Sequence, residues 1–138
     1  MANPSNPITP FRPFGPDHTP YEAIGGEDGV RRLVDAFYDH IRDDSPVLRA
    51  MHPPDDTESR LKLFEFLSGW MGGPQLYMEK RGHPRLRMRH MPFPVDQEAV
   101  DAWLACMEAA MQDCEIQGPL LAFLTERFTH TANFLRNR

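Results

Sequence analysis

Apolar side chains in this 138-residue chain recur at helical spacing, and no segment alternates apolar and polar residues for long. The apolar positions of 30–41 follow the pattern i, i+3, i+4, i+7, i+8, i+11, which is typical of one face of an amphipathic helix. Comparable faces recur in 61–71, 100–114 and 120–135. The pattern therefore predicts an all-α domain without a sheet.

Helix-capping and helix-breaking residues lie between these segments. Thr19-Pro20 and Ser45-Pro46 each place a hydroxyl side chain directly before a proline, which is typical of a helix start. The first pair predicts a short helix that ends at Gly25-Gly26, and the second predicts one that ends near Ala50. Caps or breakers for the longer helices stand at Asp55–Thr57, Asp96 and Gly118-Pro119.

Composition excludes several classes of protein. Charged residues make up 25% and apolar residues 41%, as in an ordinary soluble domain, and the formal net charge of -5 provides no basic field for nucleic acid or anionic membrane. Cys106 and Cys114 lie eight residues apart in a helical segment, so their backbones are roughly 12 Å apart, too far for a disulfide. We expect free thiols and a cytoplasmic protein.

The first twenty residues differ from the rest of the chain. Prolines recur there every third residue from Pro4 to Pro16, which is the period of a polyproline helix, and Phe11 and Phe14 are also three apart. One interpretation is a disordered or weakly docked extension. The other is an arm whose Phe rings pack on the domain or on a second subunit. We expect an extension over 1–20 and one domain over 21–138.

An irregular stretch, 72–94, separates two strongly apolar helices. Gly72-Gly73-Pro74 ends the first helix, and Met91 precedes a proline, which biases it out of the helical region. Between these points Pro84 suits the first position of a short helix that ends at His90. Helix bundles usually connect their helices briefly, so the length of this stretch indicates that something fills the space beneath it.

The chemistry of this stretch centres on two histidines. His83 and His90 lie at opposite ends of the short helix, and no acidic or cysteine residue offers a third ligand at zinc spacing. A single histidine facing an apolar cavity suits an iron porphyrin, because the porphyrin supplies four ligands and needs one neutral imidazole. The alternative for His90 is an exposed helix-end histidine that interacts with the helix dipole.

A haem also requires apolar walls and cations for its two propionates. The candidate cations are Lys62, Arg85 and Arg89. The candidate walls are Leu63, Phe64, Leu67, Tyr77, Met88, Phe93, Met107 and Phe128. Taken singly, each of these has an ordinary alternative, as a core residue or as a solvated charge.

Two polar aromatic residues lie on otherwise apolar helix faces. Tyr38 belongs to the stripe of 30–41, and Trp103 belongs to the face of 100–114. A buried Tyr or Trp needs a partner for its O–H or N–H. The partner is either a backbone carbonyl or a ligand at which both side chains are aimed.

Several segments of this chain resemble those of a known family. The pieces YEAIGG (21–26), LVDAFYDHI (33–41), FLSGWMGGPQLY (66–77), GHPRLRMRHMPFP (82–94) and DAWLACM (101–107) resemble the group II truncated haemoglobins. The resemblance covers most of the chain from about Tyr21 to Asn137 and leaves out the Pro-rich extension. It implies a shortened globin fold, a two-over-two helical sandwich around haem b.

The resemblance also implies roles for single residues. His90, and not His83, is the expected iron ligand, and Tyr38 and Trp103 are expected on the opposite, distal side. Ser59 and Leu63 match the distal-helix positions that face the iron, and Leu63 speaks against the glutamine that group I members use. Lys62 matches a propionate partner. The site matched by His52 holds Phe, Tyr or His in different members, and here it adds a third polar group.

Three classes of function follow from this reading. The first is a haem protein that binds O2 reversibly at a five-coordinate iron and releases it slowly, because Tyr, Trp and His donate hydrogen bonds to the ligand. NO, CO, peroxide and sulfide are further candidate ligands. The second is a haem enzyme that acts on NO or peroxide with an external, unknown reductase. The third is a helical interaction domain without a cofactor. We expect no nucleic acid or membrane partner, and a monomer or a homodimer.

Overall fold

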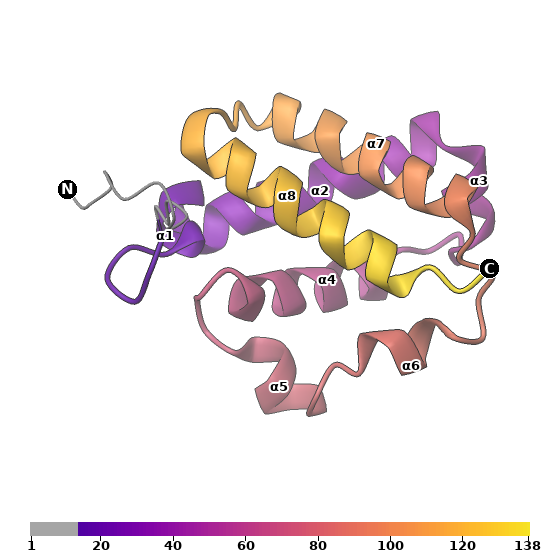
Figure 1. Ribbon diagram of the computed structural model, residues 1–138, viewed down its shortest axis with the longest axis horizontal. Coiled ribbons are helices and arrows are strands. Elements are labelled where there is room, and N and C mark those ends of the chain that lie inside the picture. Colours follow the sequence, from indigo (N-terminus) through magenta and orange to yellow (C-terminus); the bar gives the residue numbers. More distant parts are fainter. Residues whose placement is uncertain (1–13) are drawn as a thin grey trace, which may run out of the picture.

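The computed structural model describes residues 14–138, which fold into an all-α domain (Figure 1). The isolated β-bridge between Gly15 and His18 is the only extended pairing in this part of the chain. The helices within it are α1 (Pro20–Ile24), α2 (Gly26–Asp44), α3 (Pro46–Ala50), α4 (Thr57–Trp70), α5 (Leu76–Arg81), α6 (Leu86–His90), α7 (Gln97–Asp113) and α8 (Gly118–Leu135).

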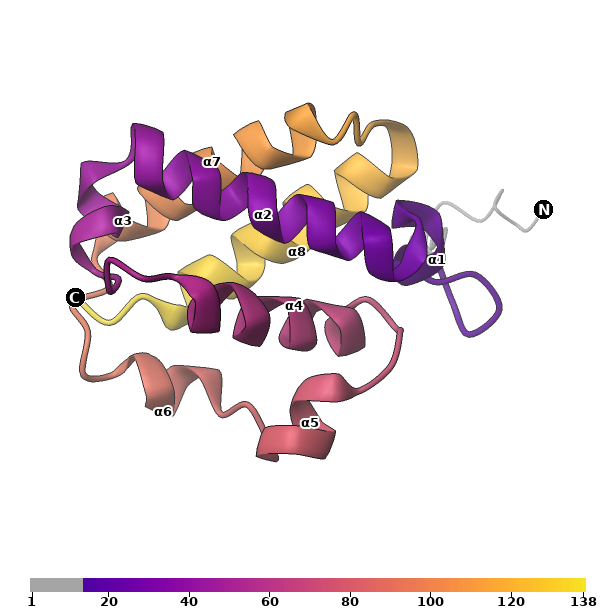
Figure 2. The same ribbon diagram turned by 180° about the vertical axis from the view of Figure 1, so that it is seen from behind.

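Two antiparallel helix pairs form the body of the domain. Figures 1 and 2 show α2 alongside α4, and α7 alongside α8. Helix α2 also packs along α7, so its buried stripe joins the two pairs. The main core therefore lies where α2, α4, α7 and α8 meet, and it includes the fully buried Leu33, Phe37, Leu67, Met107 and Leu124. The expected two-over-two sandwich is confirmed.

Local sequence explains how the first helices begin and turn. The Thr19 side chain accepts a hydrogen bond from the Glu22 backbone, and the Glu22 carboxylate accepts one from the Thr19 backbone, which is a complete capping box. Gly25 ends α1 with φ of 106°. A side chain at Gly29 would come within 1.9 Å of the Ile24 carbonyl oxygen, so glycine there lets α2 pass close to the end of α1.

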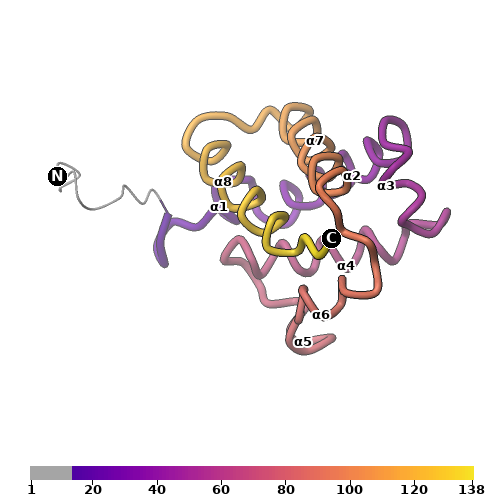
Figure 3. Tube along the Cα trace, turned by 45° about the vertical axis from the view of Figure 1, so that its right-hand side comes forward, coloured from indigo at the N-terminus to yellow at the C-terminus, as the bar shows by residue number. Residues whose placement is uncertain are grey.

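The stretch after α4 contains one more helix than the sequence analysis predicted. Helix α5 was missed, and α6 begins at Leu86 instead of Pro84 because Arg85 has a left-handed φ of 46°. We call 76–90 the proximal strap. Figure 3 shows that it runs beneath α4 and returns toward the start of α7.

The described end of the N-terminal extension contacts the domain. The Phe14 ring meets Phe123 of α8 edge-on, with centroids 5.0 Å apart, and it stacks on His18. This contact supports the interpretation of a docked arm for Phe14, whereas Phe11 lies outside the described residues. Over 14–138, no helix combines the length and the apolar character that crossing a membrane requires.

Candidate functional site

His90 is the last residue of α6, and its ring is held in one orientation. The ring Nδ1 lies 2.7 Å from the carbonyl oxygen of Leu86, one helical turn earlier. Because a carbonyl oxygen accepts, Nδ1 carries the proton and donates it, which leaves Nε2 as the ring nitrogen available to a ligand. A bond from Nδ1 to a backbone carbonyl is a common way to orient a metal-binding imidazole. His83, by contrast, is exposed, and its Nδ1 accepts from the Arg85 backbone.

The C-terminus fixes the backbone that carries His90. The Asn137 side chain donates to the His90 carbonyl at 3.1 Å and to the Phe93 carbonyl at 3.0 Å. Its oxygen accepts from the Val95 backbone at 3.0 Å, and its own backbone N–H donates back to Val95 at 2.8 Å. Asn137 thus closes the turn that follows α6 against the end of α8.

Tyr38 is buried on α2 at 7% exposure, and its hydroxyl makes no hydrogen bond to the described residues. No fully buried side-chain polar atom among these residues lacks a partner, so the hydroxyl itself is accessible. Burial, followed by the nearby Asp56 carboxylate, raises the pKa of Tyr38 to about 12, while Arg60 acts in the opposite direction. The phenol therefore stays protonated at physiological pH, and an accessible donor without a protein partner is suited to a ligand.

Trp103 lies on α7 beside the same group of aromatic rings. Its ring is 5.2 Å from Phe37, the neighbour of Tyr38, and 5.5 Å from Phe128, which in turn stacks on Trp70. The indole N–H, like the Tyr38 hydroxyl, makes no hydrogen bond within 14–138. The backbone-carbonyl alternative for these two side chains is therefore not observed.

His52 follows α3 and approaches Tyr38 edge-on. The two ring centroids are 5.8 Å apart with an interplanar angle of 88°. The His52 Nδ1 lies 2.7 Å from the Leu48 carbonyl, so the ring is oriented in the same way as that of His90, with Nε2 free to accept. The structure brings Tyr38 of α2 together with His52 of the connection that follows α3.

Helix α4 has three distinct faces. Ser59, Leu63, Phe66 and Trp70 share one face at helical spacing, and all four are half-buried. Arg60, Phe64, Leu67 and Met71 form the second face, which packs toward α2, and the Phe64 ring lies 4.2 Å beneath the Arg31 guanidinium. Ser59 and Leu63 therefore lie apart from Phe64 and Leu67. The third face carries Glu65, which is directed at α5.

The remaining candidates lie on the strap, its continuation or exposed surface. Met88 and Phe93 are 56% and 46% exposed, which is unusual for large apolar side chains, and a flat apolar ligand would cover them. Arg89 and Arg81 lie over the Tyr77 ring at about 6 Å. Lys62 forms an exposed ion pair with Glu58 at 2.8 Å, and Arg85 is exposed.

Two cavities include some of the candidate residues in their lining, but neither is lined by His90, Tyr38 or Trp103. One of about 120 Å³ lies between α4 and the strap, and its lining includes Phe66, Tyr77 and Pro84. The other, of about 420 Å³, lies between α7 and α8 and includes the buried Met107 and Phe128 in its lining. Met107 is fully buried in the main core, so it supports the site from within the α7–α8 pair.

Sequence reasoning missed two charged residues on α4. Arg60 occupies the face that packs on α2, and Glu65, only 1% exposed, accepts from Lys80 at 2.7 Å and from Arg81 at 2.9 Å. Burial opposes the ionisation of Glu65, yet these two hydrogen bonds bring its pKa below the ordinary value. A signal was present, because each residue is a charge on an otherwise apolar helix face. The partners themselves come from other elements.

Comparisons with known proteins agree with this fold. The family model described as Bacterial-like globin matches residues 19–137. A group 2 truncated haemoglobin of Bacillus subtilis is 44% identical, over 88% of this chain and 90% of its own. The crystal structure of a group II truncated haemoglobin from Bacillus anthracis is 44% identical and superposes with a TM-score of 0.84, covering 86% of this chain and 96% of its own. A truncated oxygen-avid haemoglobin from Bacillus subtilis, also 44% identical, gives 0.82, covering 86% of this chain and 99% of its own.

Proposed function

Because this chain belongs to the bacterial-like globin family, among its group II truncated haemoglobins, we propose that it holds haem b through His90 and binds O2. Haem binding as such follows from the family. The choice of haem b, the ligand O2 and the roles of single residues are the substance of the proposal. The globin domain is taken to span 21–138, with the first twenty residues as an extension.

The donor set fits a haem. An imidazole that would hold a haem iron must be oriented, and the hydrogen bond from His90 Nδ1 to the Leu86 carbonyl supports this requirement while leaving Nε2 available. Met88 and Phe93 provide uncovered apolar surface close by in the chain. The haem, when bound, supplies an iron whose sixth position takes a diatomic ligand.

One observation carries the ligand-binding part of the proposal. The Tyr38 hydroxyl and the Trp103 indole N–H are both protonated donors without a partner in the described chain. Donors that are fixed before the ligand arrives stabilise negative charge on it without reorganisation. His52, oriented by Leu48, is placed to accept from the Tyr38 hydroxyl and so to select its direction.

The propionate partners belong to the same proposal. Lys62 is paired with the exposed Glu58, and an exposed pair contributes little, so Lys62 can exchange Glu58 for a propionate. Arg85 and Arg89 lie on the strap and are the other candidates. The solved Bacillus subtilis relative is described as oxygen-avid, which supports slow release of O2 here.

The test begins with haem binding and continues with O2 release. The wild-type protein reconstituted with haem should give a strong Soret band. His90→Ala should lose haem or the spectrum of an axial imidazole, whereas the control His83→Ala should match the wild type. Tyr38→Phe should then release O2 about 10- to 100-fold faster, since a hydrogen bond to a charged acceptor is worth about 1.5–3 kcal/mol. An unchanged spectrum in His90→Ala, or an unchanged release rate in Tyr38→Phe, overturns the corresponding part.

A further inference from the structure

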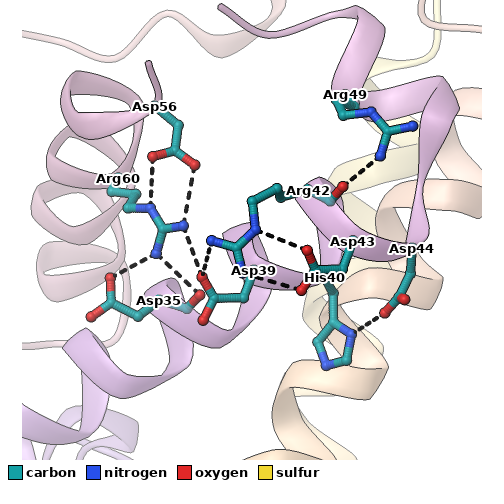
Figure 4. A network of polar contacts seen from close by, with 9 residues as sticks. All are labelled: Asp35, Asp39, His40, Arg42, Asp43, Asp44, Arg49, Asp56 and Arg60. Carbon is teal, nitrogen blue, oxygen red and sulfur yellow. Dashed lines mark hydrogen bonds and ion pairs between the residues drawn. The ribbon is translucent and has the colours of Figure 1, made fainter. Parts of the chain in front are cut away.

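The guanidinium of Arg60 meets three carboxylates at the start of α4 (Figure 4). Its Nε donates to Asp56 at 2.9 Å, and one terminal nitrogen donates to Asp56 at 3.2 Å and to Asp39 at 2.9 Å. The other terminal nitrogen donates to the side chain and the carbonyl of Asp35, at 3.2 and 3.3 Å. All five N–H groups of the guanidinium thus have an acceptor.

This cluster joins the segments that carry the proposed distal residues. Asp35 and Asp39 lie on α2, on either side of Tyr38 in the sequence. Asp56 ends the connection that begins with His52, and Arg60 directly follows Ser59 on α4. The Arg60 side chain therefore links three segments: α2, the connection before α4, and the start of α4. Without it, the start of α4 and the connection before it would have no ion pair to α2 among the described residues.

Arg60 also contacts Tyr38 itself. The guanidinium carbon lies 5.6 Å from the centroid of the Tyr38 ring, within the range of a cation–π contact. The Arg60 side chain is 22% exposed, so water screens this contact less than it screens a surface pair. The ring of Tyr38 thus contacts the guanidinium and also meets the Phe37 ring edge to face, with centroids 5.3 Å apart.

We propose that Arg60 is a positioning residue that sets where the Tyr38 hydroxyl points in the distal pocket. This inference rests on the proposed role of Tyr38 as a hydrogen-bond donor to the ligand. Arg60 acts through Tyr38 and through the start of α4, and it does not touch the ligand. A residue that only stabilised the fold would change the free energy of unfolding and leave the properties of the bound ligand unchanged.

Lysine cannot reproduce this arrangement. An ammonium group has three donors on a flexible stem and lacks the planar fork that reaches Asp56 with two parallel bonds while also binding Asp35 and Asp39. Arg60→Lys keeps the charge and loses the geometry, whereas Arg60→Met loses both. Asp56→Asn leaves the guanidinium in place with a weakened anchor, and it is a milder variant if Arg60→Met folds poorly.

The experiment is a double-mutant cycle between Arg60 and Tyr38 on the haem-loaded protein. Two properties are measured: the rate of O2 dissociation and the C–O stretching frequency of the carbon monoxide complex, which falls when a donor points at the ligand. Arg60→Met should speed O2 release about three- to tenfold and raise the C–O frequency, with Arg60→Lys and Asp56→Asn in between. In the Tyr38→Phe background, Arg60→Met should change neither property.

The matched control is Arg42→Met, which removes a cation of α2 that does not contact the Tyr38 ring. Arg42 is 60% exposed, pairs with its neighbour Asp43 at 2.8 Å and reaches Asp39 only at 3.6 Å, so both ligand properties should match the wild type. If Tyr38→Phe alone has no effect, the proposed function fails. If Tyr38→Phe acts as expected but Arg60→Met leaves both properties unchanged, or acts equally in both backgrounds, the role of Arg60 is refuted and the proposed function stands.

Discussion

The two sides of the candidate site are built in different ways. The distal side, with Tyr38 and Trp103, lies on the long helices α2 and α7, whose buried stripes form the core. The proximal side, with His90, lies on a strap whose two short helices bury no residue completely. The strap is held at one end by Glu65 and at the other by Asn137. Core packing places the helices of the proposed distal donors, with the Arg60 cluster as an additional polar tether, whereas the strap of the proposed iron ligand is held mainly by polar tethers.

This difference predicts where single substitutions are costly. Removing a polar contact to a fully buried group lowers the free energy of unfolding strongly, because water cannot hydrogen-bond to the buried partner instead. Removing a polar contact between exposed groups lowers it little, because water replaces the contact and salt screens it. Burial of the partner, and not the number of contacts, should therefore rank the following effects.

The largest effect is expected at the α5 end of the strap. Lys80→Met with Arg81→Met leaves the Glu65 carboxylate buried without a counter-charge, which should lower the free energy of unfolding by about 3 kcal/mol. Urea denaturation of the haem-loaded protein measures this. Adding Glu65→Met to the double variant should restore most of the loss. Arg87→Met, which removes a strap cation that Glu65 does not contact, should change stability by less than about 0.5 kcal/mol.

The pH dependence of this tether has a definite sign. The pKa of Glu65 is lower in the folded protein than in the unfolded chain, so its contribution is present above the unfolded pKa and is lost as pH falls through the folded pKa. The stability difference between wild type and Glu65→Gln should be constant near neutral pH and shrink in acid. A difference that grows in acid would mean that the carboxyl is protonated in the native state.

An intermediate effect is expected at the other end of the strap. Asn137→Ala removes two hydrogen bonds donated to the carbonyls of His90 and Phe93 and one accepted from Val95. We expect the free energy of unfolding to fall by about 1–2 kcal/mol, because these backbone groups are partly exposed and water replaces some of the hydrogen bonds. The specific readout is haem transfer to an acceptor protein, which should become faster, together with a shifted iron–histidine stretching band. Asn133→Ala, whose amide bonds only the Thr129 carbonyl of its own helix, is the control and should leave that band in place.

The contrast also explains what the sequence could predict. The long helices follow from apolar periodicity and from caps such as Asp96, and the short α3 follows from the cap Ser45, because these signals are local. His90 follows from the breakers around it and from the family resemblance. Helix α5 and the left-handed Arg85 did not follow, since their conformations depend on tertiary contacts. Arg60 and Glu65 bind partners from 15 to 25 residues away, and no local pattern shows which residues those are.

The smallest effect is expected on the packed side, at the far end of α2. His40 lies between Asp44, 2.5 Å from Nδ1, and Asp113 of α7, 2.6 Å from Nε2. Hydrogen bonds to Asp44 and then to Asp113 raise the pKa of His40 above its ordinary value. The imidazolium therefore stabilises the fold fully below the unfolded pKa of about 6.5, and this contribution is lost as pH rises through the folded pKa. Both carboxylates are more than half exposed, so we expect the contact to add about 0.5 kcal/mol to the free energy of unfolding.

His40→Gln should be less stable than the wild type near pH 5.5 and equal to it near pH 9. Because core packing already joins α2 to α7, O2 release should not change in this variant. A change in O2 release would show that the distal side depends on polar tethers beyond the Arg60 cluster.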